Sequence, residues 1–219
     1  MDRSGMIALA PSVFRVQPSK VTPTKYCSFF VVHPQGNLML PCFAKGASIE
    51  GAFEAMADMG GVSAQLLGDM HLKSNHCDVL HKRFGAWTHC SEPERDDVGK
   101  SVGNVKAFPF HRHHLFPHVE VIPTPGHRPG GTCFLVEMDG FRALFAGDNV
   151  GYDGANWTAF PSKSGKEALR QSLSRLADCE FDVLYAITLA VEPVCSISLP
   201  TAEARQCFFN DVAIQAGLV

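Results

Sequence analysis

The chain has 219 residues, of which 46% are hydrophobic and 19% charged, and its formal net charge is −3. This composition is typical of one globular domain over residues 1–219, and it excludes a disordered chain, a coiled coil and a collagen-like repeat. The near balance of charge gives no basis for binding nucleic acid, and no apolar run reaches the roughly 18 residues that a membrane span needs.

The first half of the chain predicts strands with two interleaved helices. Alternating β-branched and aromatic residues, separated by turn residues, predict strands over residues 13–16, 26–33 and 38–42. Helical spacing after Ser48, which can act as an N-cap, predicts a helix up to the glycines at 60 and 61. A strand over 63–68, a polar loop, a helix over 75–84 and a strand over 86–90 follow, and the charged segment 92–103 is interpreted as a solvated helix or loop.

The second half of the chain predicts a hairpin followed by two helices. Strands are expected over 104–110 and 119–122, and two apolar runs around residues 138–140 predict a hairpin over 131–148. An amphipathic helix over 166–177, a buried strand over 181–188 and a helix over 201–216 complete the chain. Strands with interleaved and trailing helices predict an α+β fold, in which two mixed sheets pack together and helices cover their outer faces.

The cysteines and the N-terminus point to a reducing compartment. The eight cysteines form no CxxC pair, so we interpret them as reduced thiols that pack as small hydrophobic residues. The first residues lack the apolar stretch of a secretory signal, and the sequence therefore predicts a cytoplasmic protein.

Histidines are confined to one part of the chain. All ten lie between His33 and His127. Three polar loops, each at the end of a predicted strand, carry candidate site residues, and they span 69–78, 123–131 and 145–149. Loops at strand ends are where mixed folds commonly build their sites.

These loops contain HLKSNH at 71–76, PTPGHRPGG at 123–131 and LFAGDN at 144–149. Their order and spacing resemble the metallo-β-lactamase-fold hydrolase superfamily, whose first metal motif is HxHxDH, over residues 26–188. The resemblance implies a four-layer αββα sandwich, with His71, His76, His127 and Asp148 as metal ligands.

The sequence departs from the family pattern at three positions. Lys73 stands in place of the second histidine, Asn75 stands in place of the aspartate, and no histidine follows the strand predicted over 181–188. An ammonium about 4 Å from an ion is repelled by roughly 4 kcal/mol per unit charge at an effective dielectric of 20. A dinuclear centre is therefore not expected, and the sequence predicts one zinc ion or none.

Two functions follow from this pattern. One is a metal-dependent hydrolase of a small ester, thioester or phosphoester-type substrate, in which Asp148 orients water, Lys73 contacts the substrate anion and Asn75 stands at the usual acceptor position. The other is a non-catalytic protein with a binding or interaction role, in which Lys73 pairs with Asp148 in place of a metal.

A second group of histidines lies close together in the sequence, at positions 111, 113, 114 and 118. Their position between two predicted strands favours exposed loop imidazoles over a metal tract. The chain has no GxSxG elbow, phosphate-binding loop or GxGxxG motif, so a serine hydrolase, a nucleotide hydrolase and a dinucleotide-binding enzyme have no support.

Overall fold

A computed structural model describes residues 5–16, 27–42, 49–187 and 194–219. The first sheet has seven strands in chain order, antiparallel from β1 to β4 and parallel from β4 to β7. These strands are β1 (Met6–Ala10), β2 (Val13–Val16), β3 (Ser28–Val31), β4 (Leu38–Leu40), β5 (Ala64–Leu66), β6 (Trp87–Ser91) and β7 (Val105–Phe108).

The second sheet has six strands in the order β15-β14-β11-β10-β9-β8, and only β11 and β14 are parallel neighbours. These strands are β8 (His113–Phe116), β9 (Val119–Pro123), β10 (Thr132–Met138), β11 (Phe141–Phe145), β14 (Val183–Tyr185) and β15 (Ser196–Ser198). A separate two-stranded hairpin joins β12 (Val150–Tyr152) to β13 (Trp157–Ala159).

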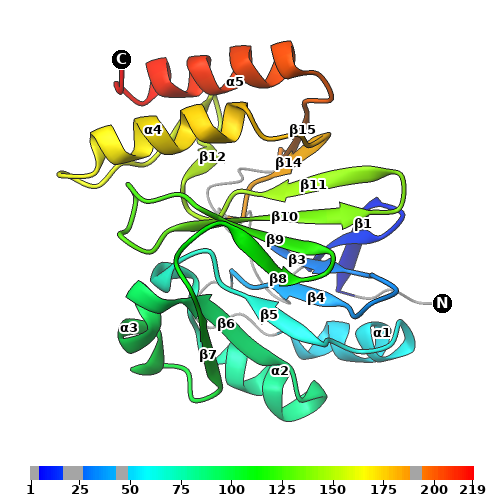
Figure 1. Ribbon diagram of the computed structural model, residues 1–219. Helices are drawn as coiled ribbons and strands as arrows, with labels where there is room; N and C mark the ends of the chain where they lie inside the picture. Colours follow the sequence, from blue (N-terminus) through cyan, green and yellow to red (C-terminus); the bar gives the residue numbers. More distant parts are fainter. Residues whose placement is uncertain (1–4, 17–26, 43–48, 188–193) are drawn as a thin grey trace.

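Helices cover the outer faces of the two sheets (Figure 1). The first sheet carries α1 (Phe53–Asp58), α2 (His76–Phe84) and α3 (Arg95–Gly99), and the second carries α4 (Lys166–Ala177) and α5 (Ala202–Gln215). Three short 3-10 turns accompany them: η1 (Glu50–Ala52), η2 (Met70–Leu72) and η3 (Glu92–Glu94). In the part of the chain that the structure describes, no helix is both long and apolar enough to cross a bilayer.

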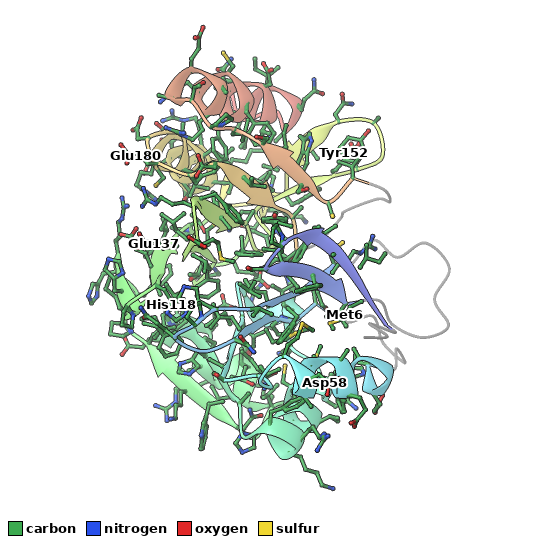
Figure 2. The ribbon with its side chains drawn as sticks, turned by 90° about the vertical axis from the view of Figure 1, so that its right-hand side faces the viewer. Met6, Asp58, His118, Glu137, Tyr152 and Glu180 are labelled. Carbon is green, nitrogen blue, oxygen red and sulfur yellow. The ribbon has the colours of Figure 1, made fainter. Side chains whose placement is uncertain are left out.

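Three apolar layers hold this sandwich together, and side chains fill the space between the sheets (Figure 2). In the central layer, the ring of Phe29 on one sheet lies 5.6 Å from Phe145 and 5.4 Å from Tyr185 on the other. A second layer joins the six-stranded sheet to α4 and α5, and a third joins the seven-stranded sheet to α1 and α2. The predicted four-layer αββα architecture is confirmed.

Most local signals gave the expected elements. Helix α4 buries Leu169, Leu173 and Leu176 on one face, as its amphipathic spacing predicts. The Thr201 side chain accepts a hydrogen bond from the backbone N–H of Ala204 at 3.1 Å and so begins α5. The predictions at Tyr26, Ser48 and residue 188 lie outside the described residues.

Several short strands were missed, and one group of histidines differs from the expectation. Sequence reasoning did not predict β1, β8, β15 or the β12–β13 hairpin, because strands of three to five residues carry little periodicity. His113 and His114 belong to β8 and pair with β9. His118 is buried and stacks on His33, with ring centroids 3.8 Å apart, so it is not an exposed loop imidazole.

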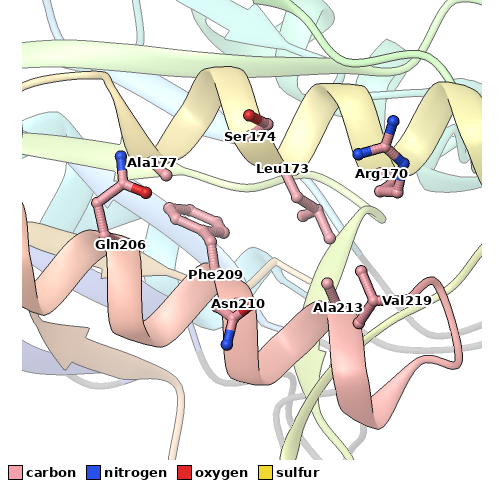
Figure 3. Close-up of a pocket in the computed structure, with 9 residues that line it drawn as sticks. All are labelled: Arg170, Leu173, Ser174, Ala177, Gln206, Phe209, Asn210, Ala213 and Val219. Carbon is pink, nitrogen blue, oxygen red and sulfur yellow. The ribbon is translucent and has the colours of Figure 1, made fainter.

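A shallow pocket lies where α4 and α5 pack against each other (Figure 3). Apolar side chains, among them Leu173 and Phe209, form its floor, and Arg170 and Gln206 lie at its edge. The three polar loops singled out in the sequence contribute no residue to this pocket.

Two glycines bring the loops that follow β5 and β11 into contact. A Cβ atom on Gly68 would lie 2.8 Å from the Cα of Gly147, so only glycine allows this approach. The backbone N–H of Thr132 donates to the carbonyl of Gly68 at 2.8 Å and fixes the loop against β10. The residues that follow these glycines, Asp69 and Asp148, are thereby brought together between the two sheets.

We expect Gly68→Ala to lower the free energy of unfolding by about 1–3 kcal/mol, because the added methyl group forces the two loops apart. Gly99→Ala is the matched control, since nothing lies within 4 Å of its Cβ position and the free energy should change little. Urea denaturation of both variants measures the difference, and equal stabilities would contradict the close approach.

Burial lowers the pKa of His89 from 6.5 to about 4, and Lys106 adds to the shift. Below about pH 6.5 this histidine binds a proton in the unfolded chain, whereas in the folded chain it stays neutral down to about pH 4. The free energy of unfolding should therefore fall between about pH 6.5 and 4 and level off below that, by about 3 kcal/mol in all. The difference between the parent and His89→Gln, measured by denaturation at pH 7 and pH 4, isolates this contribution, and a pH-independent difference would argue against it.

Candidate metal centre

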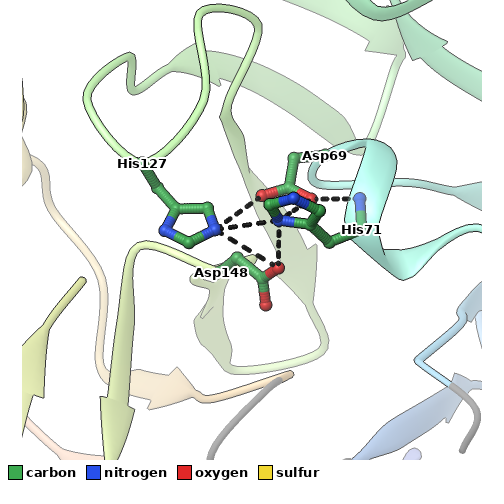
Figure 4. A group of neighbouring side chains, drawn as sticks. All are labelled: Asp69, His71, His127 and Asp148. Atoms are coloured by element: carbon green, nitrogen blue, oxygen red, sulfur yellow. Dashed lines mark hydrogen bonds and ion pairs between the residues drawn. The ribbon is translucent and has the colours of Figure 1, made fainter. Parts of the chain in front are cut away.

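Four side chains from three loops converge at one end of the sandwich: Asp69, His71, His127 and Asp148 (Figure 4). Asp69 and His71 belong to the loop and turn after β5, His127 follows β9, and Asp148 follows β11. Their donor atoms all lie within 4.8 Å of one another. The two sheets thus contribute to a single cluster.

The distances within the cluster suit a single ion. His71 Nδ1 and His127 Nε2 are 3.0 Å apart, and they lie 3.5 and 3.7 Å from Asp148 Oδ2. Asp69 lies 3.7 Å from His71 Nδ1 through Oδ1 and 3.8 Å from His127 Nε2 through Oδ2. A tetrahedral ion with bonds of 2.0–2.2 Å separates its ligands by about 3.3–3.6 Å, and the four groups lie close enough to bind one ion after small side-chain shifts.

The chain also fixes the orientation of His127. Its Nδ1–H donates to the backbone carbonyl of Phe160 at 2.6 Å. With the proton held on Nδ1, the lone pair on Nε2 points into the cluster, which is the arrangement that metal-binding imidazoles require. The His71 side chain is 47% exposed and that of His127 is 21% exposed, so the cluster opens to solvent on the His71 side.

The two carboxylates are buried and face each other across the cluster. The side chain of Asp69 is 1% exposed and that of Asp148 is 8% exposed. Burial, and then the charge of Asp148, raise the pKa of Asp69 to about 8. A hydrogen bond to Asp148 raises the pKa of His71. Asp148 contributes to both shifts through its negative charge, which a cation between the two carboxylates would balance.

A bound divalent ion fits this donor set. Two imidazole nitrogens and two carboxylate oxygens are ligands that zinc and related divalent metals accept. Asp148 Oδ1 is buried and has no hydrogen-bond partner, which is costly unless something else satisfies the carboxylate. The residues present therefore fit a divalent metal.

Glu94 ties together the two loops that carry the histidines. It is buried, its Oε2 accepts the backbone N–H of Met70 at 2.7 Å, and its Oε1 accepts that of Gly130 at 3.0 Å. Met70 lies between Asp69 and His71 in the sequence, and Gly130 lies in the His127 loop. One carboxylate thus sets the spacing between ligands from different sheets.

The structure brings together three of the four predicted ligands and replaces the fourth. His71, His127 and Asp148 lie in the cluster, whereas His76 is outside it, at the first residue of α2, with its Nδ1 3.2 Å from Ser74 Oγ. Asp69 takes the fourth place, and sequence reasoning missed it. The sequence did carry a signal for Asp69. When the HxHxDH motif is aligned to begin at residue 69 instead of residue 71, Asp69 and His71 occupy the positions of its first two histidines.

The predicted pairing of Lys73 with Asp148 is wrong. Lys73 Nζ donates to the backbone carbonyl of Asp97 at 2.7 Å. The reason is local: η2 ends at Leu72, and Lys73 has an extended backbone, with φ −66° and ψ 141°, which turns its side chain toward α3. Asn75 is exposed and precedes α2, outside the cluster.

Comparison with known structures gives the fold a name. The chain has the metallo-β-lactamase fold: it superposes on the Rm3 metallo-beta-lactamase with a TM-score of 0.63 and 16% identity, covering 96% of this chain and 91% of that one. A metallo-beta-lactamase from Cronobacter sakazakii with a HARLDQ motif gives 0.60 and 18%, covering 84% and 78%.

An archaeal metallo-beta-lactamase superfamily protein from Sulfolobus tokodaii gives a TM-score of 0.63 and 11% identity, covering 92% of this chain and 86% of that one. The sequence matches no family model and no curated protein. Fold and cluster together define a metallo-β-lactamase-fold protein with a His/Asp site that can hold a divalent metal.

We expect Glu94→Gln to weaken metal binding about 10- to 100-fold, because the amide leaves only one oxygen to accept the two backbone N–H groups. Glu92→Gln is the matched control, since Glu92 is exposed two residues away. Competition with a chromophoric chelator measures both affinities. Equal affinities for the two variants and the parent would show that Glu94 does not position the ligands.

Proposed function

We propose that this protein is a hydrolase with a mononuclear zinc centre, acting on a small-molecule ester, thioester or phosphoester-type substrate. The observation that supports it is the convergence of Asp69, His71, His127 and Asp148, whose donor atoms lie within 4.8 Å of one another, in a fold shared with metallo-β-lactamases. Lys73 stands within the motif of the first loop, but it is a cation directed toward α3 and offers no ligand to a second ion.

A zinc ion at this centre supplies a Lewis acid for a carbonyl or phosphoryl oxygen and brings the pKa of water toward 7. The residues of this chain supply the orientation of the ligands and the balance of charge. His127 presents a fixed lone pair through its bond to Phe160, and the carboxylates of Asp69 and Asp148 balance the added charge. Asp148 Oδ1 is free to accept a hydrogen bond from the attacking water, and the exposed side of His71 leaves a way in for substrate.

A second candidate is a non-catalytic metal-binding protein. Four protein donors can complete a tetrahedral shell, as in structural zinc sites, whereas catalytic sites keep one position open. The two candidates differ in whether Asp69 binds the ion or remains the cap of η2, where its Oδ1 accepts the backbone N–H of His71 at 2.7 Å.

Elemental analysis of protein purified without chelator should find one divalent ion per chain. His127→Ala should lower metal affinity at least about 100-fold and abolish hydrolysis of a panel of aryl esters, thioesters and phosphodiesters, because it removes a ligand from a site with at most four. His114→Ala, an exposed histidine on β8, is the control and should retain both.

Three results would decide between the candidates. A protein that binds no divalent ion at micromolar concentration would contradict both. One that binds an ion but hydrolyses nothing in the panel, even as Asp69→Ala, would favour the non-catalytic candidate. Hydrolysis that follows metal content would support the proposed enzyme.

A further inference from the structure

Arg128 lies beside the metal centre without a carboxylate partner. It follows the ligand His127, and its Nη2 contacts the sulfur of Met70 at 2.9 Å. Met70 lies between Asp69 and His71, so the guanidinium borders both ligand loops. Its Nε is buried and makes no hydrogen bond. Among the residues that the structure describes, no carboxylate lies within ion-pair distance of Arg128.

The contacts of Arg128 differ from those of the arginines that pair with a glutamate, which are Arg83, Arg112, Arg142 and Arg170. Arg205 also has a buried Nε without a hydrogen bond, but its Nη1 donates to the backbone carbonyls of Phe181 and Leu199. The half-buried Arg128 instead has a thioether, which is a weak acceptor, and one unsatisfied N–H group. A buried donor without a partner costs free energy that an incoming acceptor would recover.

Lys73 is a second cation, in the loop that carries Asp69 and His71. Its Nζ donates to the Asp97 carbonyl and forms no ion pair within the described ranges of the chain. Pairing with Lys100 lowers the pKa of Asp97, and Lys73 and Arg128 lower it further, so both cations lie within electrostatic reach of this carboxylate on α3.

The Asp97 carboxylate on α3 pairs with a different cation. Its Oδ1 lies 2.6 Å from Lys100 Nζ, so Lys73 and Arg128 keep their capacity for another anion. A guanidinium offers two parallel N–H groups that match the two oxygens of a carboxylate or phosphate, and a nearby ammonium adds a point charge.

We propose that Arg128, assisted by Lys73, binds an anionic group of the substrate, a carboxylate or a phosphate, next to the metal centre. The proposal rests on the proposed function and narrows its substrate class: the hydrolysed bond lies close to a negatively charged group. Arg128 is thus a residue that determines specificity.

The first test is binding, which needs no turnover. Isothermal titration of inorganic phosphate and of acetate, with protein as purified and after chelator treatment, compares the parent with Arg128→Met. We expect the affinity for at least one of these anions to fall about tenfold or more. Arg83→Met, a surface arginine on α2, is the matched control and should leave both affinities unchanged. Which of the two anions responds identifies the group.

Direct binding of phosphate to the metal contributes equally to the affinities of the parent and the variant. The difference between these affinities therefore measures the contribution of Arg128. Metal content and melting temperature are measured in parallel, and Arg128→Lys, which keeps the charge without the two parallel N–H groups, serves as a second variant. Equal anion affinities in the parent, Arg128→Met and Arg128→Lys would overturn the proposal.

The second test is substrate preference. A matched pair of esters, one neutral and one with a carboxylate near the scissile bond, gives a ratio of kcat/KM values. That ratio should favour the anionic ester in the parent and fall about tenfold or more in Arg128→Met, with no change in Arg83→Met. If Arg128→Met does not change this ratio, the proposed anionic substrate class is wrong, but the proposed hydrolase function still stands. If neither the parent nor any variant hydrolyses either ester, the proposed function is wrong. The titrations then test the anion site independently of hydrolysis.

Discussion

Two buried carboxylates that face each other are the constraint around which this end of the molecule is built. Asp69 and Asp148 come from different sheets and are almost excluded from water. Like charges in such a place repel unless a cation or proton lies between them, and the raised pKa of Asp69 expresses that cost. The imidazoles of His71 and His127 complete a donor set that fits a divalent ion, and such an ion would balance the two negative charges.

The contacts around the centre serve to hold this unfavourable arrangement in place. Gly68 and Gly147 allow the two aspartate loops to touch, and Glu94 links the two histidine loops through their backbones. On the outer side, α4 packs directly on the His127 loop: a Cβ on Gly126 would meet Leu169 at 2.4 Å, and Ser172 Oγ donates to the carbonyl of Pro125 at 2.8 Å. The outer apolar layers therefore contribute to the site as well as to stability.

The departures from the family motif have a common consequence. With Lys73 directed to α3 and Asn75 exposed, Asp69 and His71 are the residues of the loop after β5 that lie in the cluster. The lysine that stands in the motif adds a positive charge to the same loop. A centre with fewer ions and more positive side chains is suited to an anionic ligand, because the protein supplies charge that a second metal would otherwise provide.

Apolar periodicity and turn residues predicted most strands, the main helices and a sandwich of two sheets covered by helices, because these features are encoded locally. The four-layer assignment and three of the four clustered side chains, His71, His127 and Asp148, came instead from the resemblance of three loops to the motifs of a known superfamily. The sequence could not choose between Asp69 and His76, which are both polar residues of one loop. That choice depends on where η2 begins, and on the backbone turn that directs Lys73 away. The roles of Glu94 and Arg128 also had no local signal, since each is defined by contacts with residues more than twenty positions away. Tertiary packing decided them, because only the folded chain brings those loops within bonding distance.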